Sequence, residues 1–105
     1  YLQVARNVAT RWNKNDNCLL VAGATYPEEL KEIRKIVGDI PLLIPGIGKQ
    51  GGDLEKVIKY GQDSKGQGMI INSSSDIIFA SGGKHFAEVA QKETLKIHKS
   101  ISELI

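Results

Sequence analysis

The sequence has little cysteine, no long hydrophobic run and no block of like charge, and each absence excludes a class of protein. Cys18 is the only cysteine in the 105 residues, so no disulfide forms within the chain and a reducing, cytoplasmic setting is expected. No stretch approaches the roughly 20 apolar residues that span a bilayer, so we expect no membrane insertion. The 14 basic and 12 acidic side chains are interspersed, which argues against a nucleic-acid partner.

Histidine is also scarce, and the two histidines lack the neighbours that indicate a site. His85 and His98 have no carboxylate or cysteine constellation around them. A zinc site needs three or four such ligands, and a catalytic triad needs an acid and a nucleophile. We therefore expect no metal site and expect both histidines to be surface or packing residues.

The sequence does contain a repeated alternation of short apolar runs and amphipathic segments. Leu2, Ala5 and Val8 recur at helical spacing and predict a helix over 2–12. The apolar run at 18–22 is typical of a strand buried on both faces, with Cys18 as a small apolar side chain. The predicted strands are 18–24, 41–45 and 68–73, and the helices predicted to follow them are 26–37, 53–60 and 83–104.

The spacing of these elements predicts an α/β fold with a parallel sheet. Successive strands begin 23 and 27 residues apart, which leaves room for the helical connection that parallel pairing requires. We expect the strands to be adjacent in sequence order, with the helices on one side. A barrel needs eight such units, so three units and a start at Tyr1 inside a helical pattern indicate part of a longer fold.

Local signals predict where the helices begin and end. Thr25 is the expected N-cap of the helix over 26–37, with Glu28 at the capping-box position. Gly38 is expected to end that helix, and Asp53 to cap the next one. The segment 72–76 is expected to be a polar turn.

Three segments follow the strands at the edge where parallel sheets bind ligands, namely 23–25, 45–53 and 72–76. The second contains a G-x-G-x-x-G pattern from Gly46 onward, whose backbone can approach a phosphate closely. A dinucleotide site is disfavoured, because the acidic residue expected about 20 positions later would fall inside the third strand. Two interpretations stay open: the phosphate site that barrels build after their last two strands, or glycines that only make tight turns.

These segments resemble a known family. The resemblance is carried by PGIGKQGGDLE, by VAGATYPEELKEIRKIVGDIPLLI before it and by GQGMIINSSSDIIFAS after it. In this order they resemble the carboxyl-terminal part of bacterial orotidine 5′-phosphate decarboxylases over essentially the whole chain. The resemblance implies a TIM (β/α)8 barrel, with residues 1–105 as the carboxyl-terminal portion of a single domain. Residues 18–105 would form the sixth to eighth strand–helix units, and residues 1–13 the fifth helix.

The resemblance also implies a nucleotide ligand of the orotidine or uridine 5′-monophosphate type. In this family pattern Gln50 is the glutamine that closes over the phosphate, and Pro45 lies near the pyrimidine ring. Gly48 and Ser74 are further candidate phosphate-binding residues from their places in the loops after the strands, although Ser73 and Ser74 could equally only end the strand. Ser75, also assigned to the phosphate, stands where the family pattern has an arginine. A serine hydroxyl is one neutral donor, whereas a guanidinium makes two charge-assisted bonds, so weaker phosphate binding is expected.

No residue of the chain is expected to be catalytic. The family pattern includes a D-x-K-x-x-D segment that holds the catalytic carboxylates and a proton-donating lysine, and the sequence has no complete copy. Asp63-Ser-Lys65 matches the first half but precedes a strand, so we interpret it as a polar loop on the amino-terminal face. The resemblance implies no metal and no organic cofactor.

Two functions stay open. As part of an enzyme, the chain would be the phosphate-binding part of an orotidine 5′-monophosphate decarboxylase, a lyase of pyrimidine biosynthesis, inactive alone because its acid–base groups lie elsewhere. As a binding module, it would be a degenerate half-barrel that holds a phosphate ligand or serves assembly. Open strand edges predict pairing with the missing half of the barrel or with a second copy in a homo-oligomer.

Overall fold

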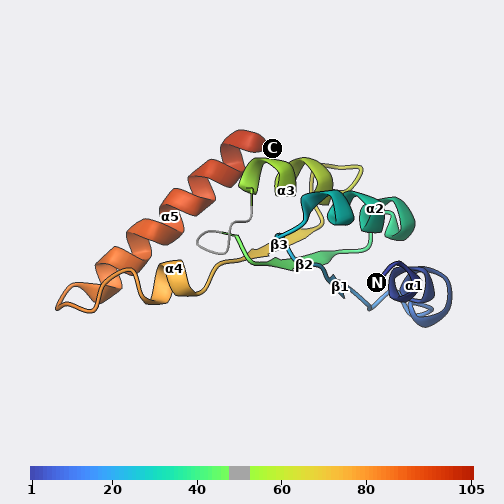
Figure 1. Ribbon diagram of the computed structural model, residues 1–105, viewed down its shortest axis with the longest axis horizontal. Helices are drawn as coiled ribbons and strands as arrows, with labels where there is room; N and C mark the ends of the chain where they lie inside the picture. The colour runs from blue at the N-terminus through green and yellow to red at the C-terminus, as the bar shows by residue number, and fades with distance from the viewer. Residues whose placement is uncertain (48–52) are drawn as a thin grey trace.

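A computed structural model of the chain describes residues 1–47 and 53–105. These residues form a three-stranded parallel sheet in the order β1-β2-β3, with helices packed on one face (Figure 1). The elements in chain order are α1 (Leu2–Asn7), the π-helical turn η1 (Val8–Trp12), β1 (Leu20–Val21), α2 (Pro27–Val37), β2 (Leu42–Pro45), α3 (Leu54–Gly61), β3 (Met69–Asn72), α4 (Ser75–Ile78) and α5 (Phe86–Leu104).

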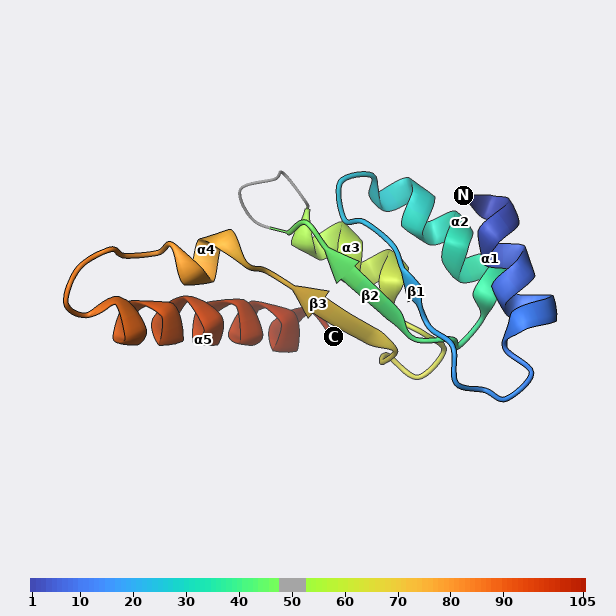
Figure 2. The ribbon, with the colours of Figure 1, turned by 90° about the horizontal axis from the view of Figure 1, so that it is seen from below.

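The molecule is elongated because its last two helices extend beyond the sheet. Figure 2 shows α4 and α5 as an arm past the end of β3, whereas α1, α2 and α3 lie together near the sheet. The radius of gyration is 15.2 Å, against about 13 Å for a compact domain of this length. α5 contains no buried residue, although Ile97 packs against the core. α5 therefore contacts α3 and α4 without fully burying any of its own side chains.

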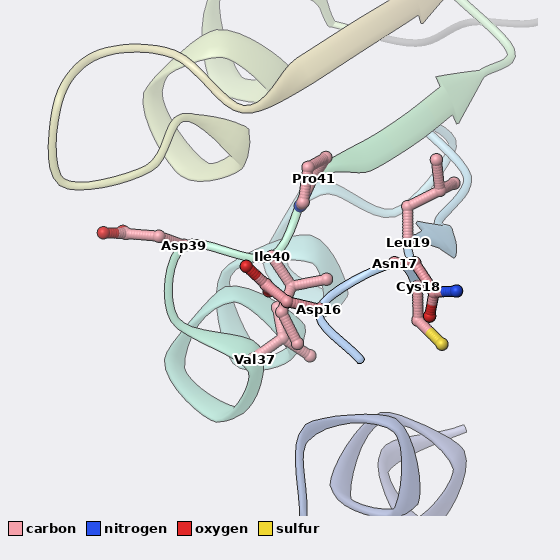
Figure 3. Close-up of a pocket in the computed structure, with 8 residues that line it drawn as sticks. All are labelled: Asp16, Asn17, Cys18, Leu19, Val37, Asp39, Ile40 and Pro41. Atoms are coloured by element: carbon pink, nitrogen blue, oxygen red, sulfur yellow. The ribbon is translucent and has the colours of Figure 1, made fainter. Parts of the chain in front are cut away.

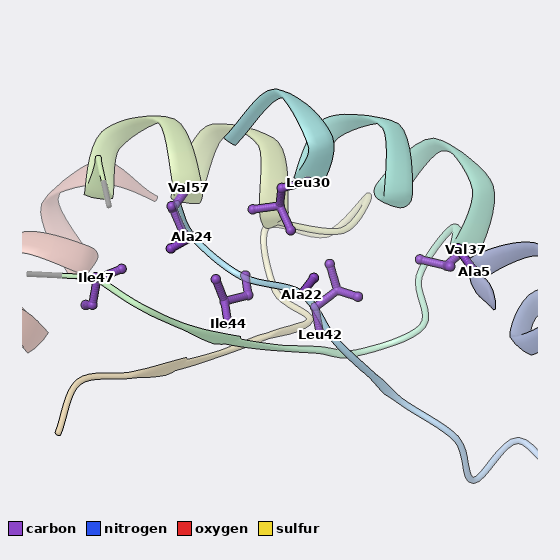
Figure 4. Packing of buried hydrophobic residues seen from close by; sticks show 9 residues of the cluster. All are labelled: Ala5, Ala22, Ala24, Leu30, Val37, Leu42, Ile44, Ile47 and Val57. Carbon is purple, nitrogen blue, oxygen red and sulfur yellow. The ribbon is translucent and has the colours of Figure 1, made fainter. Parts of the chain in front are cut away.

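The hydrophobic core lies between the sheet and the helices α2 and α3. Leu42 and Ile44 of β2 face Leu30 of α2 and Val57 of α3, and all four are at most 1% exposed (Figure 4). These side chains come from alternate positions of a strand and from one stripe of each helix. The apolar side of the strand and the apolar stripes of the two helices therefore pack together in a single layer.

The opposite face of the sheet is uncovered in the described residues. Val21 is 64% exposed and Ile70 is 53% exposed, whereas their neighbours Leu20 and Ile71 pack against the core. The expectation of a first strand buried on both faces is therefore wrong for this chain. One layer of helices covers one face, and alternate strand side chains point away from that layer.

The structure confirms the predicted strand order, the parallel pairing and the helices that follow each strand. Two local expectations need correction. Cys18 precedes β1 instead of lying within it, and its amide donates to Oδ1 of Asn13 at 2.8 Å. Tyr26, and not Thr25, is the N-cap of α2, without a side-chain cap bond. The helix begins at Pro27, whose ring already fixes the backbone of the first turn.

The carboxyl-terminal segment also departs from expectation. Residues 72–76 were expected to form only a polar turn, but Ser75 begins the short helix α4. Phe86 and Leu104, the first and last residues of α5, are 61% and 40% exposed. Periodicity groups residues on one face of a helix but does not supply the surface against which that face packs.

Asp53 caps α3 as predicted, since its Oδ1 accepts from the amide of Lys56 at 3.2 Å. Replacing Asp53 by alanine removes that acceptor from the first turn, and we expect the free energy of unfolding to fall by about 1 kcal/mol. Urea denaturation followed by circular dichroism measures the change. Asp53→Asn keeps a capping oxygen and is the matched control, so an equal loss in both variants would contradict a capping role.

Candidate functional site

The loops after β2 and β3 surround a hollow of about 150 Å³ at the carboxyl ends of these strands. Pro45 and Asn72, the last residues of the two strands, are paired in register, so both loops leave from the same edge of the sheet. Ligands of parallel α/β sheets bind at this edge. The hollow is lined by Pro45, Gly46, Ile47, Asn72, Ser73, Ser74 and Ser75.

The lining of the hollow is rich in neutral hydrogen-bonding groups. Gly46 has a φ of 93°, so the loop after β2 turns in a conformation that favours glycine. Three consecutive serines bring hydroxyls that both donate and accept. Ser74 is the N-cap of α4, and its carbonyl accepts from the amides of Ile77 and Ile78 at 3.1 and 2.8 Å. Such a lining suits an anionic or hydroxyl-bearing ligand.

The structure brings part of the predicted phosphate site together. Pro45, Ser74 and Ser75 line the same hollow, although a strand, a helix and a loop separate Pro45 from the serines in the sequence. Ser75 is half-buried and Ser74 is exposed. Gly48 and Gln50 lie outside the described residues, so their roles toward the phosphate stay predictions.

Ile47 and Asn72 fall in the segments 45–53 and 72–76 that were predicted at the ligand-binding edge, but neither was named as a site residue. Asn72 is exposed at the end of β3, on the same face as Ile70. The alternation of a strand would place it there once Met69 and Ile71 are assigned to the helix-covered face. Ile47 is 7% exposed, and one isoleucine in a glycine-rich segment carries no comparable signal.

A second cavity, of about 260 Å³, adjoins the first and reaches α5. Ile47 and Ser73 line both cavities. Lys96 and Glu93 of α5 line the second one, so charged side chains of the last helix lie near the serine-lined hollow. The full lining is Ile47, Leu54, Ser73, Asp76, Glu93, Lys96, Ile97 and Ser100.

A cavity of about 620 Å³, larger than both of these, lies at the other end of the sheet. Figure 3 shows its walls, which are the segment that enters β1 and the segment that connects α2 to β2. This is the amino-terminal edge, which in parallel sheets serves stability and not ligand chemistry. The larger volume therefore does not make it the candidate site. Its lining is Asp16, Asn17, Cys18, Leu19, Val37, Asp39, Ile40 and Pro41.

Arg34 of α2 was also missed by sequence reasoning, and it organises the amino-terminal end of the fold. Its Nε donates to the carbonyl of Gly61 at 2.9 Å, and its Nη1 donates to the carbonyls of Gly38 and Ile40, both at 2.7 Å. Nη2 donates to Gly61 again and to Gly68 at 3.2 Å. The guanidinium therefore joins the ends of α2 and α3 to the segments that enter β2 and β3.

Carboxylates around Arg34 have structural roles. Partial burial lowers the pKa of Arg34, against the opposing effect of Asp63 and Asp39. The amide and the hydroxyl of Ser64 donate to Asp39 at 3.0 and 2.8 Å and hold the pKa of that carboxyl below its usual value. Oδ1 of Asp63 accepts from the amides of Lys65 and Gln67 at 2.8 and 2.9 Å. This confirms that Asp63 belongs to a polar loop before β3.

Within residues 1–47 and 53–105, no group of three or more histidine, cysteine, aspartate or glutamate side chains could hold a metal ion. His85 is exposed and its Nδ1 lies 2.8 Å from a carboxylate oxygen of Glu88, in agreement with a surface role. None of the helices in the same part of the chain is long and apolar enough to cross a membrane.

No protein-family model matches the chain. Its sequence is nevertheless similar to proteins named orotidine 5′-phosphate decarboxylase. The relative from Janthinobacterium sp. (strain Marseille) is 47% identical over 105 residues, which are 100% of this chain and 39% of the relative. The relative from Bordetella avium (strain 197N) is 50% identical over 103 residues, which are 97% of this chain and 38% of the relative. The chain spans about two fifths of the length of these relatives.

Solved structures give the same result. The structure of Leishmania donovani OMP decarboxylase matches 94% of this chain and 36% of its own, with a TM-score of 0.73 and 29% identity. The structure of Leishmania donovani UMP synthase matches 88% of this chain and 21% of its own, with a TM-score of 0.71 and 33% identity. The resemblance to the carboxyl-terminal part of orotidine 5′-phosphate decarboxylases is confirmed. The fold class is confirmed too: the sheet and its helices form part of a TIM (β/α)8 barrel.

Proposed function

We propose that this chain, whose whole length matches orotidine 5′-phosphate decarboxylases, is the phosphate-binding part of a single barrel domain with that activity. The domain converts orotidine 5′-monophosphate and a proton to uridine 5′-monophosphate and carbon dioxide, a cytoplasmic step of pyrimidine biosynthesis. Residues 1–105 are the carboxyl-terminal portion of this domain.

The position of the hollow is the observation that carries the proposal. It lies where β2 and β3 end, and a frequent phosphate site of TIM barrels is built by the loops after the last two strands. Ser74 and Ser75 supply donors to the phosphate, and Gln50 and Gly48 complete the site from the loop after β2. Pro45 lies at the edge of the hollow and is assigned to the side of the pyrimidine ring.

The hollow contributes binding energy and not chemistry. A phosphate that takes no part in bond breaking still accelerates a reaction when its binding energy holds the reacting end in place. The groups that stabilise and protonate the carbon left by carbon dioxide come from the rest of the barrel, because the chain has no complete D-x-K-x-x-D segment. We therefore assign no catalytic residue to this chain and expect no decarboxylation by it alone.

The rest of the barrel is the proposed partner. Val21 and Ile70 lie exposed on the uncovered face of the sheet, and a barrel encloses that face as its packed interior. The backbone edges of β1 and β3 are also free to pair within the described residues, and closure of a barrel removes such edges. A second copy of the chain competes for the same surfaces.

A hybrid barrel tests the proposed function. In this hybrid, the chain replaces the 105 matching residues of the Janthinobacterium relative. We expect the hybrid to convert orotidine 5′-monophosphate to uridine 5′-monophosphate, followed by absorbance, and the chain alone to give no product. Product from the purified chain alone would contradict the assignment of catalysis to the rest of the barrel.

The alternative function is a degenerate half-barrel that binds a phosphate ligand or serves assembly. The absence of a basic side chain among Pro45–Ile47 and Asn72–Ser75 favours this alternative, since phosphate sites commonly use a guanidinium. A folded hybrid that binds uridine 5′-monophosphate in calorimetry without turning over the substrate would support it and overturn the enzymatic proposal.

A further inference from the structure

The hollow after β2 and β3 has no positive charge of its own. Its described lining residues are 45–47 and 72–75, and none of these side chains is charged. The phosphate of a nucleotide is an anion, and neutral donors bind an anion less tightly than charged donors do. A phosphate site at this hollow therefore gains affinity from a cation on a neighbouring element.

Lys96 of α5 is the basic residue that lines the adjoining cavity of about 260 Å³. Ile47 and Ser73 line both cavities, so the cavity of Lys96 opens beside the serine-lined hollow. α5 packs against α3 and α4, and Ile97, the next residue along the chain, packs against the core. This contact of Ile97 fixes the rotation of the helix and keeps Lys96 on the side of the cavity.

Lys96 can present its ammonium group to an anion. The ion pairs formed among the described residues involve other side chains. Lys96 is exposed, and a lysine stem can lie along a cavity wall while its charged end stays mobile in water. The ammonium group is therefore not committed to a carboxylate in this part of the chain.

Two carboxylates share the cavity with Lys96. Asp76 of α4 and Glu93, three residues before Lys96, line it as well. Because like charges repel, carboxylates beside the hollow weaken the binding of a phosphate, and a lysine among them offsets that repulsion. Removing the charge of Lys96 and removing the charge of Glu93 should therefore change the affinity for phosphate in opposite directions.

We propose that Lys96 is a phosphate-binding residue, which supplies from α5 the positive charge that the family pattern places on an arginine at the position of Ser75. The inference rests on the proposed function, since it assumes that the phosphate of the nucleotide lies among residues 73–75. It also accounts for the neutral lining of the hollow, because the cation of the site then comes from the last helix and not from the two loops.

The test uses the hybrid barrel and three probes measured by calorimetry: uridine 5′-monophosphate, inorganic phosphate and uridine. Lys96→Met keeps an unbranched side chain and removes its charge, so we expect it to weaken the binding of uridine 5′-monophosphate and of phosphate about 10-fold at low salt. The affinity for uridine should not change, and added salt should reduce the loss. Lys96→Arg should keep the affinity for phosphate, and Glu93→Gln should increase it.

Lys99→Met is the matched control, because Lys99 is an exposed lysine of α5 that lines neither cavity. It should leave all three affinities unchanged. In a hybrid that already carries Ser75→Arg, Lys96→Met should weaken binding by about 2-fold or less, because the arginine then supplies the charge and the two effects are not additive. Lys96→Gln removes the same charge and replaces Lys96→Met if the methionine variant does not fold.

Each other outcome overturns the inference in a distinguishable way. If the hybrid binds uridine 5′-monophosphate and Lys96→Met binds it equally well, Lys96 does not reach the phosphate, and the proposed function stands without it. Equal losses for Lys96→Met and Lys99→Met mean that only the net charge of the helix matters. An equal loss for uridine means that Lys96 supports the fold and not the phosphate. If the hybrid with Lys96 intact binds neither nucleotide nor phosphate, the proposed function fails together with the inference.

Discussion

Unfolding of the hybrid barrel is expected to require about 3 kcal/mol less free energy when Arg34 is replaced by leucine. The guanidinium donates to the carbonyls of Gly38, Ile40, Gly61 and Gly68. Leucine fills part of the volume but donates to none of them. Bonds to a charged donor contribute more than neutral ones, and partly buried carbonyls left without a donor add to the loss.

Arg34→Lys should recover only a minor part of this stability. An ammonium on a flexible stem cannot hold the planar fork of a guanidinium, which here reaches carbonyls from several elements at once. Lys35→Leu is the matched control, because Lys35 is on the same helix and forms an exposed ion pair with Glu32 at 2.7 Å. Such pairs contribute roughly 0 to 1 kcal/mol. Urea denaturation that gives equal losses for Arg34→Leu and Lys35→Leu would show that the carbonyl network does not stabilise the fold.

Ser75→Arg in the hybrid barrel is expected to tighten binding of uridine 5′-monophosphate by about 10- to 100-fold. Ser75 is half-buried and lines the hollow after β3, at the position where the family pattern has an arginine. A guanidinium there would form two charge-assisted bonds with the phosphate in place of one neutral bond. The gain should be largest at low salt, because salt screens the added charge.

Ser102→Arg is the control for the added charge, since Ser102 lies exposed near the end of α5 and outside the lining of the hollow. Ser102→Arg should change the affinity for uridine 5′-monophosphate little. Titration with uridine, which has no phosphate, should show no gain from Ser75→Arg. If both arginine variants bind uridine 5′-monophosphate equally, Ser75 does not face the phosphate, and the alignment of the last strand with the family pattern is wrong.

The features predicted correctly from the sequence depend on neighbours in the chain. Asp53 caps α3 because the amide it accepts lies three residues away, and the parallel order of the strands follows from the lengths of their connections. Arg34 could not be recognised in this way, because its carbonyl partners reach 27 and 34 residues along the chain. The exposure of Val21 also escaped prediction, since a continuous apolar run does not say how many layers cover the strand.

The candidate site likewise contains residues that could be predicted from the sequence and one that needed the structure. Pro45 and Ser75 were identified through the family resemblance and Ser74 from its place after the third strand, and the register of β2 and β3 explains why they meet. Asn72 was included in the segment 72–76 at the ligand-binding edge but was not named as a site residue, because a polar residue at the end of a strand looks like the start of a turn. Only the exposure of alternate residues in β3 reveals the face on which it lies.

The number of strands limits how copies of this sheet can assemble. The described residues supply three parallel strands, and eight is not a multiple of three, so whole copies joined edge to edge cannot reproduce the eight-stranded ring. Two copies reach six strands and three copies reach nine. Joining β3 of one copy to β1 of the next is a head-to-tail contact, which grows without limit unless the ring happens to close. A complement of five strands would end that growth at eight, so on the strand count we expect the rest of the barrel, and not a second copy, to be the stable partner.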